Sequence, residues 1–301
     1  MRKTPMVWVA VMAAAGTLLS ACSSPTPQRA RVSDTAAATS KATERGAAPT
    51  AHQSPRVSPN PPAAYTPAWP DRTLRTANGY LLNKCVPKEL RSKATTLTTS
   101  DGLHLSALVL GDGPNGVLLN HEQGYSICSW LDTGQELAAK GFHVVLPEFR
   151  NHGASETDPE NRDIGRDAAA ALAELKRVGA QRVFLGGASC GGTTAITAGE
   201  AQKLPVTGLL IMSSPALCNP IDAVPSVRKI TAPSLFIVGS GDMNGAVEKQ
   251  VRTLYNNSGA KEKNLVIDDD GYHGTDMLRR GAHHAQIRKR VMTFIKDNAR
   301  G

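Results

Sequence analysis

The chain has 301 residues, of which 41% are hydrophobic and 20% are charged. That much apolar material argues against a wholly disordered protein. The net charge is +8, but residues 71–301 hold 27 basic against 24 acidic side chains, and aromatic residues make up only 4% of the chain. This balance excludes a strongly basic surface or an aromatic stacking platform for nucleic acid. The five cysteines lack zinc-ligand spacing, and we expect neither a metal ion nor an organic cofactor.

The N-terminal residues have the features of an export signal. Arg2 and Lys3 precede an uncharged apolar run over residues 6–21, which is short for a membrane span. The run ends in Leu-Ser-Ala-Cys at residues 19–22, which resembles the lipobox of bacterial lipoproteins. The resemblance implies a signal peptide over residues 1–21, an acyl chain such as palmitate on Cys22, and attachment to the outer side of a bacterial inner membrane. An ordinary secretory signal and an uncleaved anchor are the alternatives.

The composition changes after the cysteine. Nine of the 19 prolines fall within residues 23–70, among Ala, Thr and Ser, and no apolar periodicity remains. Such a segment buries too little surface to offset the entropy of ordering, so residues 22–70 are expected to be a disordered tether. A single folded domain is then expected over residues 71–301.

Strands and helices alternate along the expected domain. A hairpin-like turn at Ser100-Asp101-Gly102 separates two β-rich runs, and short continuous apolar runs follow that suit buried parallel strands. The predicted strands cover residues 95–99, 103–110, 116–120, 143–147, 182–186, 206–212, 234–238 and 265–267. The predicted helices cover residues 131–140, 164–178, 191–202, 245–255 and 287–298. This order predicts an α/β fold with a mostly parallel sheet covered on both faces.

The strongest local motif is G-x-S-x-G at residues 187–191, directly after a predicted buried strand and before a predicted helix. Ser189 would sit on a tight strand-to-helix turn, where the flanking glycines avoid Cβ clashes and the helix N-terminus directs free N–H groups at the site. A plain glycine-rich connection is the structural alternative.

Four further motifs follow in the order found in the α/β-hydrolase fold family, which residues 95–299 resemble. They are Asn-His-Glu-Gln-Gly at 120–124, Phe-Arg-Asn-His-Gly-Ala-Ser at 149–155, Gly-Ser-Gly-Asp at 239–242 and Gly-Tyr-His-Gly at 271–274. The chain order Ser, Asp, His is also the family's order. Glu122 stands where many members have glycine, and dienelactone-hydrolase-like members have the same His-Glu pair.

The resemblance implies a catalytic triad. Ser189 would be the nucleophile, His273 the base, and Asp242 the carboxylate that fixes the imidazole tautomer. The backbone N–H groups of Gln123 and Cys190 would form the oxyanion hole. Glu122 or a neighbour remains an alternative to Gln123.

Other residues compete for these roles. Asp268, Asp269 and Asp270 are interpreted as a solvated turn, and His283 and His284 as surface residues. His121 and His152 are interpreted as turn-stabilising. Cys190 is disfavoured as the nucleophile because position 188 is Ala rather than the glycine that its own elbow motif would need.

The cysteines that remain after lipidation permit two disulfides in an exported chain. Cys190 and Cys218 follow adjacent predicted strands, which makes them a plausible pair. Cys85 and Cys128 would then form the second pair, and four free thiols are the alternative.

Only residues 214–231 separate the sixth strand from the next, too few for a substantial cap domain. An open site follows, which suits small esters or polymer ends. Four residues follow the site loops and are candidates to line it: Tyr125, Trp130, Leu217 and Tyr272. The sequence therefore predicts an extracytoplasmic serine hydrolase, with a carboxylic ester as the preferred substrate class. A thioesterase, a peptidase and a non-catalytic binding module on the same scaffold are the alternatives.

Overall fold

The computed structural model describes residues 63–201 and 204–300. The expected signal peptide, Cys22 and most of the expected tether lie outside these residues. Within the described part of the chain, no helix is long and apolar enough to cross a membrane.

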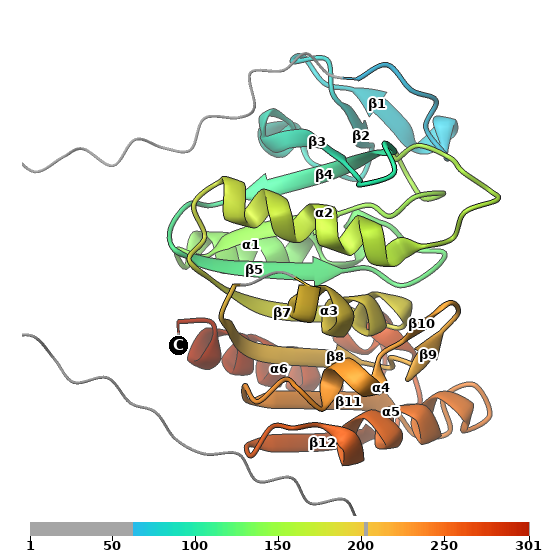
Figure 1. Cartoon of the computed structure of the whole chain (residues 1–301), viewed down its shortest axis with the longest axis vertical. Helices are drawn as coiled ribbons and strands as arrows, with labels where there is room; N and C mark the ends of the chain where they lie inside the picture. Colours follow the sequence, from blue (N-terminus) through green and yellow to red (C-terminus); the bar gives the residue numbers. More distant parts are fainter. Residues whose placement is uncertain (1–62, 202–203, 301) are drawn as a thin grey trace, which may run out of the picture. The chain divides into compact units, whose positions relative to one another are not determined.

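An eight-stranded sheet forms the centre of the domain, in the order β12-β11-β8-β7-β5-β6-β4-β3 (Figure 1). The pairs β3–β4 and β4–β6 are antiparallel and all other pairs are parallel. The sheet therefore confirms the expected mostly parallel α/β fold. The strands are β3 (Ala94–Thr98), β4 (His104–Leu110), β5 (Asn115–Asn120), β6 (His143–Pro147), β7 (Arg182–Ala188), β8 (Val206–Met212), β11 (Ser234–Gly239) and β12 (Lys263–Asp268).

Helices cover both faces of this sheet. Figure 1 shows α2 (Ile164–Arg177), α3 (Cys190–Ala201), α4 (Val224–Val227) and α5 (Ala246–Asn257) in front, with α1 (Leu131–Ala139) and α6 (His284–Asn298) behind. Successive strand residues point to opposite layers: Leu119 packs in the core beneath α1 and α6, whereas Leu118 packs beneath α2, α3 and α5. Both residues are buried, which explains why the central strands are continuous apolar runs.

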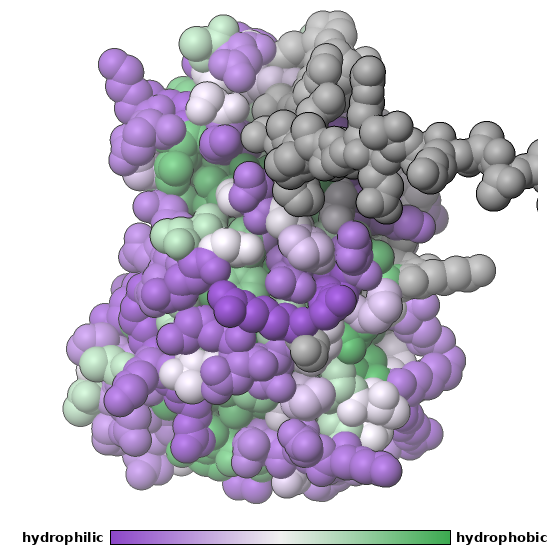
Figure 2. Space-filling model, turned by 90° about the vertical axis from the view of Figure 1, so that its left-hand side faces the viewer, coloured by the Kyte–Doolittle hydropathy of each residue, from purple (hydrophilic) through white to green (hydrophobic). Residues whose placement is uncertain are grey.

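Strand β5 lies at the point where the strand order reverses. The chain leaves β5 through α1 to β6 on one side, and returns through α2 to β7 on the other. In open α/β sheets, ligands bind beyond the carboxyl ends of the strands at such a point. The loops that follow β5 and β7 carry Gln123 and Ser189, so these two predicted site residues lie there. The opposite edge, where the parallel strands begin, is mainly hydrophilic in Figure 2.

Small elements complete the domain. A hairpin of β1 (Thr73–Arg75) and β2 (Leu81–Asn83) precedes the sheet, and a second hairpin of β9 (Leu217–Cys218) and β10 (Ile221–Asp222) follows β8. The second hairpin and the one-turn helix α4 fill the short connection between β8 and β11, so no cap domain stands there.

The packed chain begins before residue 71. Pro67 forms an isolated bridge with Glu156, and the backbone N–H of Trp69 donates to the carbonyl of Gly153 at 2.8 Å. The last residues of the expected tether therefore contact the domain, because their backbone finds hydrogen-bond partners there.

Candidate active site

Ser189 occupies a tight turn between β7 and α3. Its φ is +50°, in the left-handed region, and its N–H donates to the carbonyl of Met212 at 2.8 Å. A Cβ on Gly187 would lie 2.4 Å from the backbone of Gly191, and a Cβ on Gly191 would lie 2.4 Å from the carbonyl oxygen of His121. The two glycines of the motif are thus required by close backbone approach, and the strained serine is half-exposed at the turn.

Asp242 and His273 are brought into contact from the loops after β11 and β12. His273 Nδ1 lies 2.9 Å from both carboxylate oxygens of Asp242. The Asp242 side chain is almost wholly buried, whereas that of His273 is 25% exposed. A buried carboxylate that accepts from Nδ1 fixes the imidazole tautomer and leaves Nε2 free to accept a proton.

Glu122 connects the loop after β5 with the residues that follow His273. Glu122 Oε1 accepts from the Thr275 N–H at 2.8 Å and from the Thr275 hydroxyl, and Oε2 accepts from Ser129 Oγ at 3.3 Å. A Cβ on Gly274 would lie 2.8 Å from Glu122 Oε1 and 3.5 Å from the Cβ of Ala188, the residue before Ser189. The histidine loop is therefore packed against both the Glu122 carboxylate and the serine turn. Among the described residues, no hydrogen bond joins Ser189 to His273.

The two expected oxyanion donors have no other partner. Within residues 63–201 and 204–300, neither the Gln123 N–H nor the Cys190 N–H donates to a backbone or side-chain acceptor. Cys190 is the first residue of α3, so its N–H also belongs to the positive end of the helix. Both groups are thus free to bind a developing negative charge.

Two buried histidines join the loop after β5 to the loop after β6 through hydrogen bonds. His121 Nδ1 donates to the carbonyl of Glu122 at 2.7 Å while Nε2 accepts from the Phe149 N–H, and burial lowers the pKa of His121 to about 3. His152 Nδ1 donates to the carbonyl of Arg150 while Nε2 accepts from the Gly124 N–H at 3.0 Å, and burial lowers its pKa as well. Both rings are neutral and fully bonded, in agreement with their expected turn-stabilising role.

A family model for the alpha/beta hydrolase family matches residues 117–290, more than half of the chain. The chain belongs to the α/β-hydrolase family. Solved structures with the same fold include an esterase of Pyrococcus furiosus, 20% identical, with a TM-score of 0.58 over 71% of this chain and 94% of that one. An esterase of Exiguobacterium antarcticum is 13% identical, with a TM-score of 0.54 over 69% of this chain and 99% of that one. A monoacylglycerol lipase of Paleococcus ferrophilus is 16% identical, with a TM-score of 0.55 over 64% and 98% of the two chains.

The competing histidines have hydrogen-bond partners other than Asp242. His283 Nδ1 is 2.9 Å from Asp268 Oδ1, and His284 Nδ1 bonds the carbonyl of Gly281. Asp268 is 4% exposed, so the expected solvated turn begins only at Asp269. The Asp268 side chain is buried because it closes the loop between β12 and α6 by bonding His283.

The four residues expected to line the site of this α/β hydrolase differ in position. Leu217 and Tyr272 are 56% and 36% exposed, next to Cys218 and His273 respectively. Tyr125 is half-buried and its hydroxyl donates to Asp276 at 3.0 Å. Trp130 is 1% exposed and its indole N–H donates to the carbonyl of Asn120. Trp130 therefore packs in the core, because its only polar atom finds its partner at the end of β5.

Met243 is a further exposed residue that directly follows a residue of the candidate site. It is 62% exposed, follows Asp242 directly, and has a φ of +48°. Leu217, Met243 and Tyr272 are the exposed large hydrophobic side chains of the described residues, and each stands next to a residue of the site or of its disulfide. Nothing in the sequence around Met243 distinguished it from a core residue.

Both disulfides join the pairs expected for an exported chain. Cys190 is bonded to Cys218, and Cys85 is bonded to Cys128. The first bond ties the residue after Ser189 to the β9–β10 hairpin, and the second ties the N-terminal hairpin to the loop after β5. The first link therefore includes a proposed oxyanion donor, Cys190, whereas the second fixes the N-terminal hairpin to the turn at Ile127–Ser129.

Proposed function

We propose that this chain is a serine hydrolase that cleaves carboxylic esters through an acyl-enzyme. The observation that carries the proposal is the contact of His273 Nδ1 with the buried carboxylate of Asp242, beside a serine held at a strained strand-to-helix turn. A binding module on this scaffold would have no need to keep both the Asp242–His273 pair and the strained turn at Ser189.

The proposed reaction has two steps. His273 Nε2 takes the proton of Ser189 Oγ while Oγ attacks the ester carbonyl carbon, and the resulting oxyanion accepts from the N–H groups of Gln123 and Cys190. The intermediate collapses, the bond to the alcohol oxygen breaks, and His273 gives its proton to that oxygen. Water then attacks the acyl group with His273 again as base, which releases the acid and restores the Ser189 hydroxyl.

Two features support an ester as the substrate. The structures with the same fold described above are esterases and a monoacylglycerol lipase, although their low identity to this chain shows the fold alone. The site is also uncapped and has the exposed apolar side chains of Leu217, Met243 and Tyr272 beside it. An apolar surface next to an open nucleophile favours contact with the hydrocarbon part of an ester.

A substrate panel tests the proposal. The soluble domain, residues 63–301, would be assayed with an acetate ester, the matching thioester and a matching peptide amide, beside Ser189→Ala. We expect the highest kcat/KM with the ester, and a loss of at least a thousandfold in the variant. A higher kcat/KM for the amide or thioester would replace the proposed substrate class, and activity that survives in Ser189→Ala would contradict the mechanism.

We further propose that Cys22 is lipidated and holds the enzyme on the outer side of a bacterial membrane. The charged start, the apolar run and the placement of Cys22 support this. Full-length protein and Cys22→Ala would be expressed in a bacterium that is fed an alkyne analogue of palmitate, and the purified chains would be examined for the label. The proposal predicts that the natural chain acquires the label and the variant does not. A natural chain without label, or equal label on both chains, would contradict it.

A further inference from the structure

A cleft of about 670 Å³ opens beside the site. One wall is Gln123 and Gly124, the loop of the proposed oxyanion hole, and another is formed by the segment between β6 and α2. Cys218 and Asn219 contribute to the lining as well, and Cys218 is bonded to Cys190 next to the nucleophile. A molecule in this cleft therefore lies next to the residues that would hold the ester carbonyl.

The cleft is lined by one cationic side chain that has no partner among the described residues. Its lining residues in the described part of the chain include no Asp or Glu, and His152 is neutral. Arg150 is fully buried and forms ion pairs with Asp101 at 2.9 Å and Asp167 at 2.8 Å. Arg162 is exposed and has no hydrogen bond or ion pair from its guanidinium to any described residue. Among the described lining residues, the guanidinium of Arg162 is thus the one cationic group that is not already paired.

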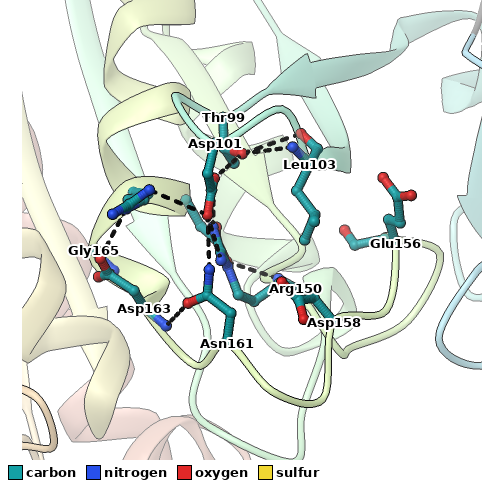
Figure 3. Close-up of polar contacts among 12 residues, drawn as sticks. Thr99, Asp101, Leu103, Arg150, Glu156, Asp158, Asn161, Asp163 and Gly165 are labelled. Atoms are coloured by element: carbon teal, nitrogen blue, oxygen red, sulfur yellow. Dashed lines mark hydrogen bonds and ion pairs between the residues drawn. The ribbon is translucent and has the colours of Figure 1, made fainter.

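The backbone on both sides of Arg162 is held in place (Figure 3). Asn161 Nδ2 donates to Asp101 Oδ2 at 2.9 Å, and the Asp163 N–H donates to Asn161 Oδ1 at 3.1 Å. Arg166 bonds the Asp163 carboxylate at 3.0 Å. The backbone of both neighbours of Arg162 is therefore fixed, while its own side chain remains free. A ligand then has to order only the side chain of Arg162 and not the loop that carries it, which limits the entropy cost of binding.

We propose that this cleft binds a carboxylate of the substrate and that Arg162 contacts it. The inference rests on the proposed esterase function and names its substrate class, an ester that carries a second, negatively charged group. A guanidinium donates two parallel hydrogen bonds to a carboxylate. One free guanidinium balances the single charge of a carboxylate, whereas a phosphate monoester has nearly two negative charges at neutral pH.

Paired esters test this inference. One pair is 4-acetoxybenzoate and 4-acetoxybenzamide, which differ in charge on the alcohol side. The other is phenyl hydrogen adipate and phenyl methyl adipate, which differ in charge on the acyl side. The natural enzyme is expected to favour the anionic member of at least one pair by about tenfold in kcat/KM, mainly through KM. Arg162→Gln should remove that preference with less than a twofold change for the neutral member, and Arg162→Lys should keep part of it.

Arg290→Gln is the matched control. Arg290 is also an exposed arginine without an ion pair among the described residues, and it lines a separate cleft with Leu235 and Asn264, at the edge where β11 and β12 begin. Removal of this charge should leave the preference unchanged.

The outcomes separate the two proposals. If no ester of either pair is cleaved, the proposed function fails. If esters are cleaved but the charge preference is absent, or is equal in the natural enzyme and Arg162→Gln, the inference about the cleft is overturned. A loss of the preference in Arg290→Gln as large as in Arg162→Gln also overturns it, because a long-range field would then account for the effect.

Discussion

Glu122 joins two parts of the site with a single side chain. It is 1% exposed, it belongs to the loop of the proposed oxyanion hole, and it accepts two hydrogen bonds from Thr275, two residues after His273. A buried carboxylate that accepts from an amide and from hydroxyl groups is well compensated. Its position indicates that it sets the distance between the proposed oxyanion hole and the proposed base, without contact with the reacting atoms.

Substitution of Glu122 should therefore change turnover more than substrate affinity. Glu122→Ala leaves the buried Thr275 N–H without an acceptor and is expected to lower kcat by about 100-fold, with KM changed less than threefold, and to cost about 1–3 kcal/mol of stability. Glu122→Gln keeps one acceptor oxygen and should retain more than a tenth of kcat. Steady-state kinetics and thermal unfolding would measure both variants. Normal kcat in a folded Glu122→Ala enzyme would contradict this positioning role.

At the scale of elements, the two disulfides brace different parts of the fold. The Cys85–Cys128 bond closes a separation of 43 residues between the N-terminal hairpin and the loop after β5, and the Cys190–Cys218 bond closes 28 residues between the start of α3 and β9. The chain-entropy model gives them similar stabilisation, about 4 and 3.5 kcal/mol. Only the second bond includes a residue whose N–H is a proposed oxyanion donor.

The two disulfides should therefore have similar effects on stability and different effects on turnover. Serine at both Cys190 and Cys218 is expected to lower kcat by about tenfold at a temperature where the protein stays folded, because the oxyanion amide loses its covalent support. Serine at both Cys85 and Cys128 is the matched control and should change kcat less than twofold. Unfolding in denaturant would measure the stability of both. Equal kcat in the two double variants would contradict the assignment.

The apolar runs and glycines of the sequence explain why the elements could be predicted. Strands such as β6 and β7 are buried on both faces, so they appear as continuous apolar runs, and Gly141 and Gly179, which have positive φ, follow the ends of the helices before β6 and β7. The hairpins β1–β2 and β9–β10 have strands of three and two residues, too short to show a period.

Residues of the candidate site could be proposed from the sequence only where they belong to local turns. Ser189, Asp242 and His273 each follow a strand in a recognisable motif. The bond between Glu122 and Thr275 joins residues 153 positions apart. The carboxylates of Asp101 and Asp167 are paired with Arg150 and not with Arg162. Such contacts are set by the tertiary structure, and no spacing in the sequence reports them.

At the scale of the whole molecule, a buried carboxyl couples folding to pH. Glu148 directly follows β6 and is fully buried, and burial raises its pKa to about 7. It accepts from Asn83 Nδ2 at 2.9 Å and from the Ala154 N–H at 2.6 Å, so it links the N-terminal hairpin to the loop after β6. The folded state therefore prefers the protonated form more than the unfolded chain does.

The contribution of Glu148 to the free energy of unfolding should fall as the pH rises from about 4.5 to about 7. Between about pH 4.5 and pH 7 the unfolded chain loses the Glu148 proton while the folded protein keeps it, which lowers the free energy of unfolding by about 3 kcal/mol. Glu148→Gln cannot ionise and should be less stable at low pH but flatter across the interval. Denaturant unfolding from pH 4.5 to pH 7.5 would measure both slopes, with Glu160→Gln, an exposed substitution, as control. An unchanged slope in Glu148→Gln would contradict the raised pKa.

The central claim is that Ser189 is an activated nucleophile. The most direct measurement is mass spectrometry of residues 63–301 after treatment with a fluorophosphonate, with Ser189→Ala and His273→Ala treated in parallel. The account predicts one adduct, located on Ser189, that is absent from Ser189→Ala and strongly reduced in His273→Ala, because the serine needs the imidazole to take its proton. A folded natural protein that acquires no adduct, or acquires it on another residue, would contradict the account.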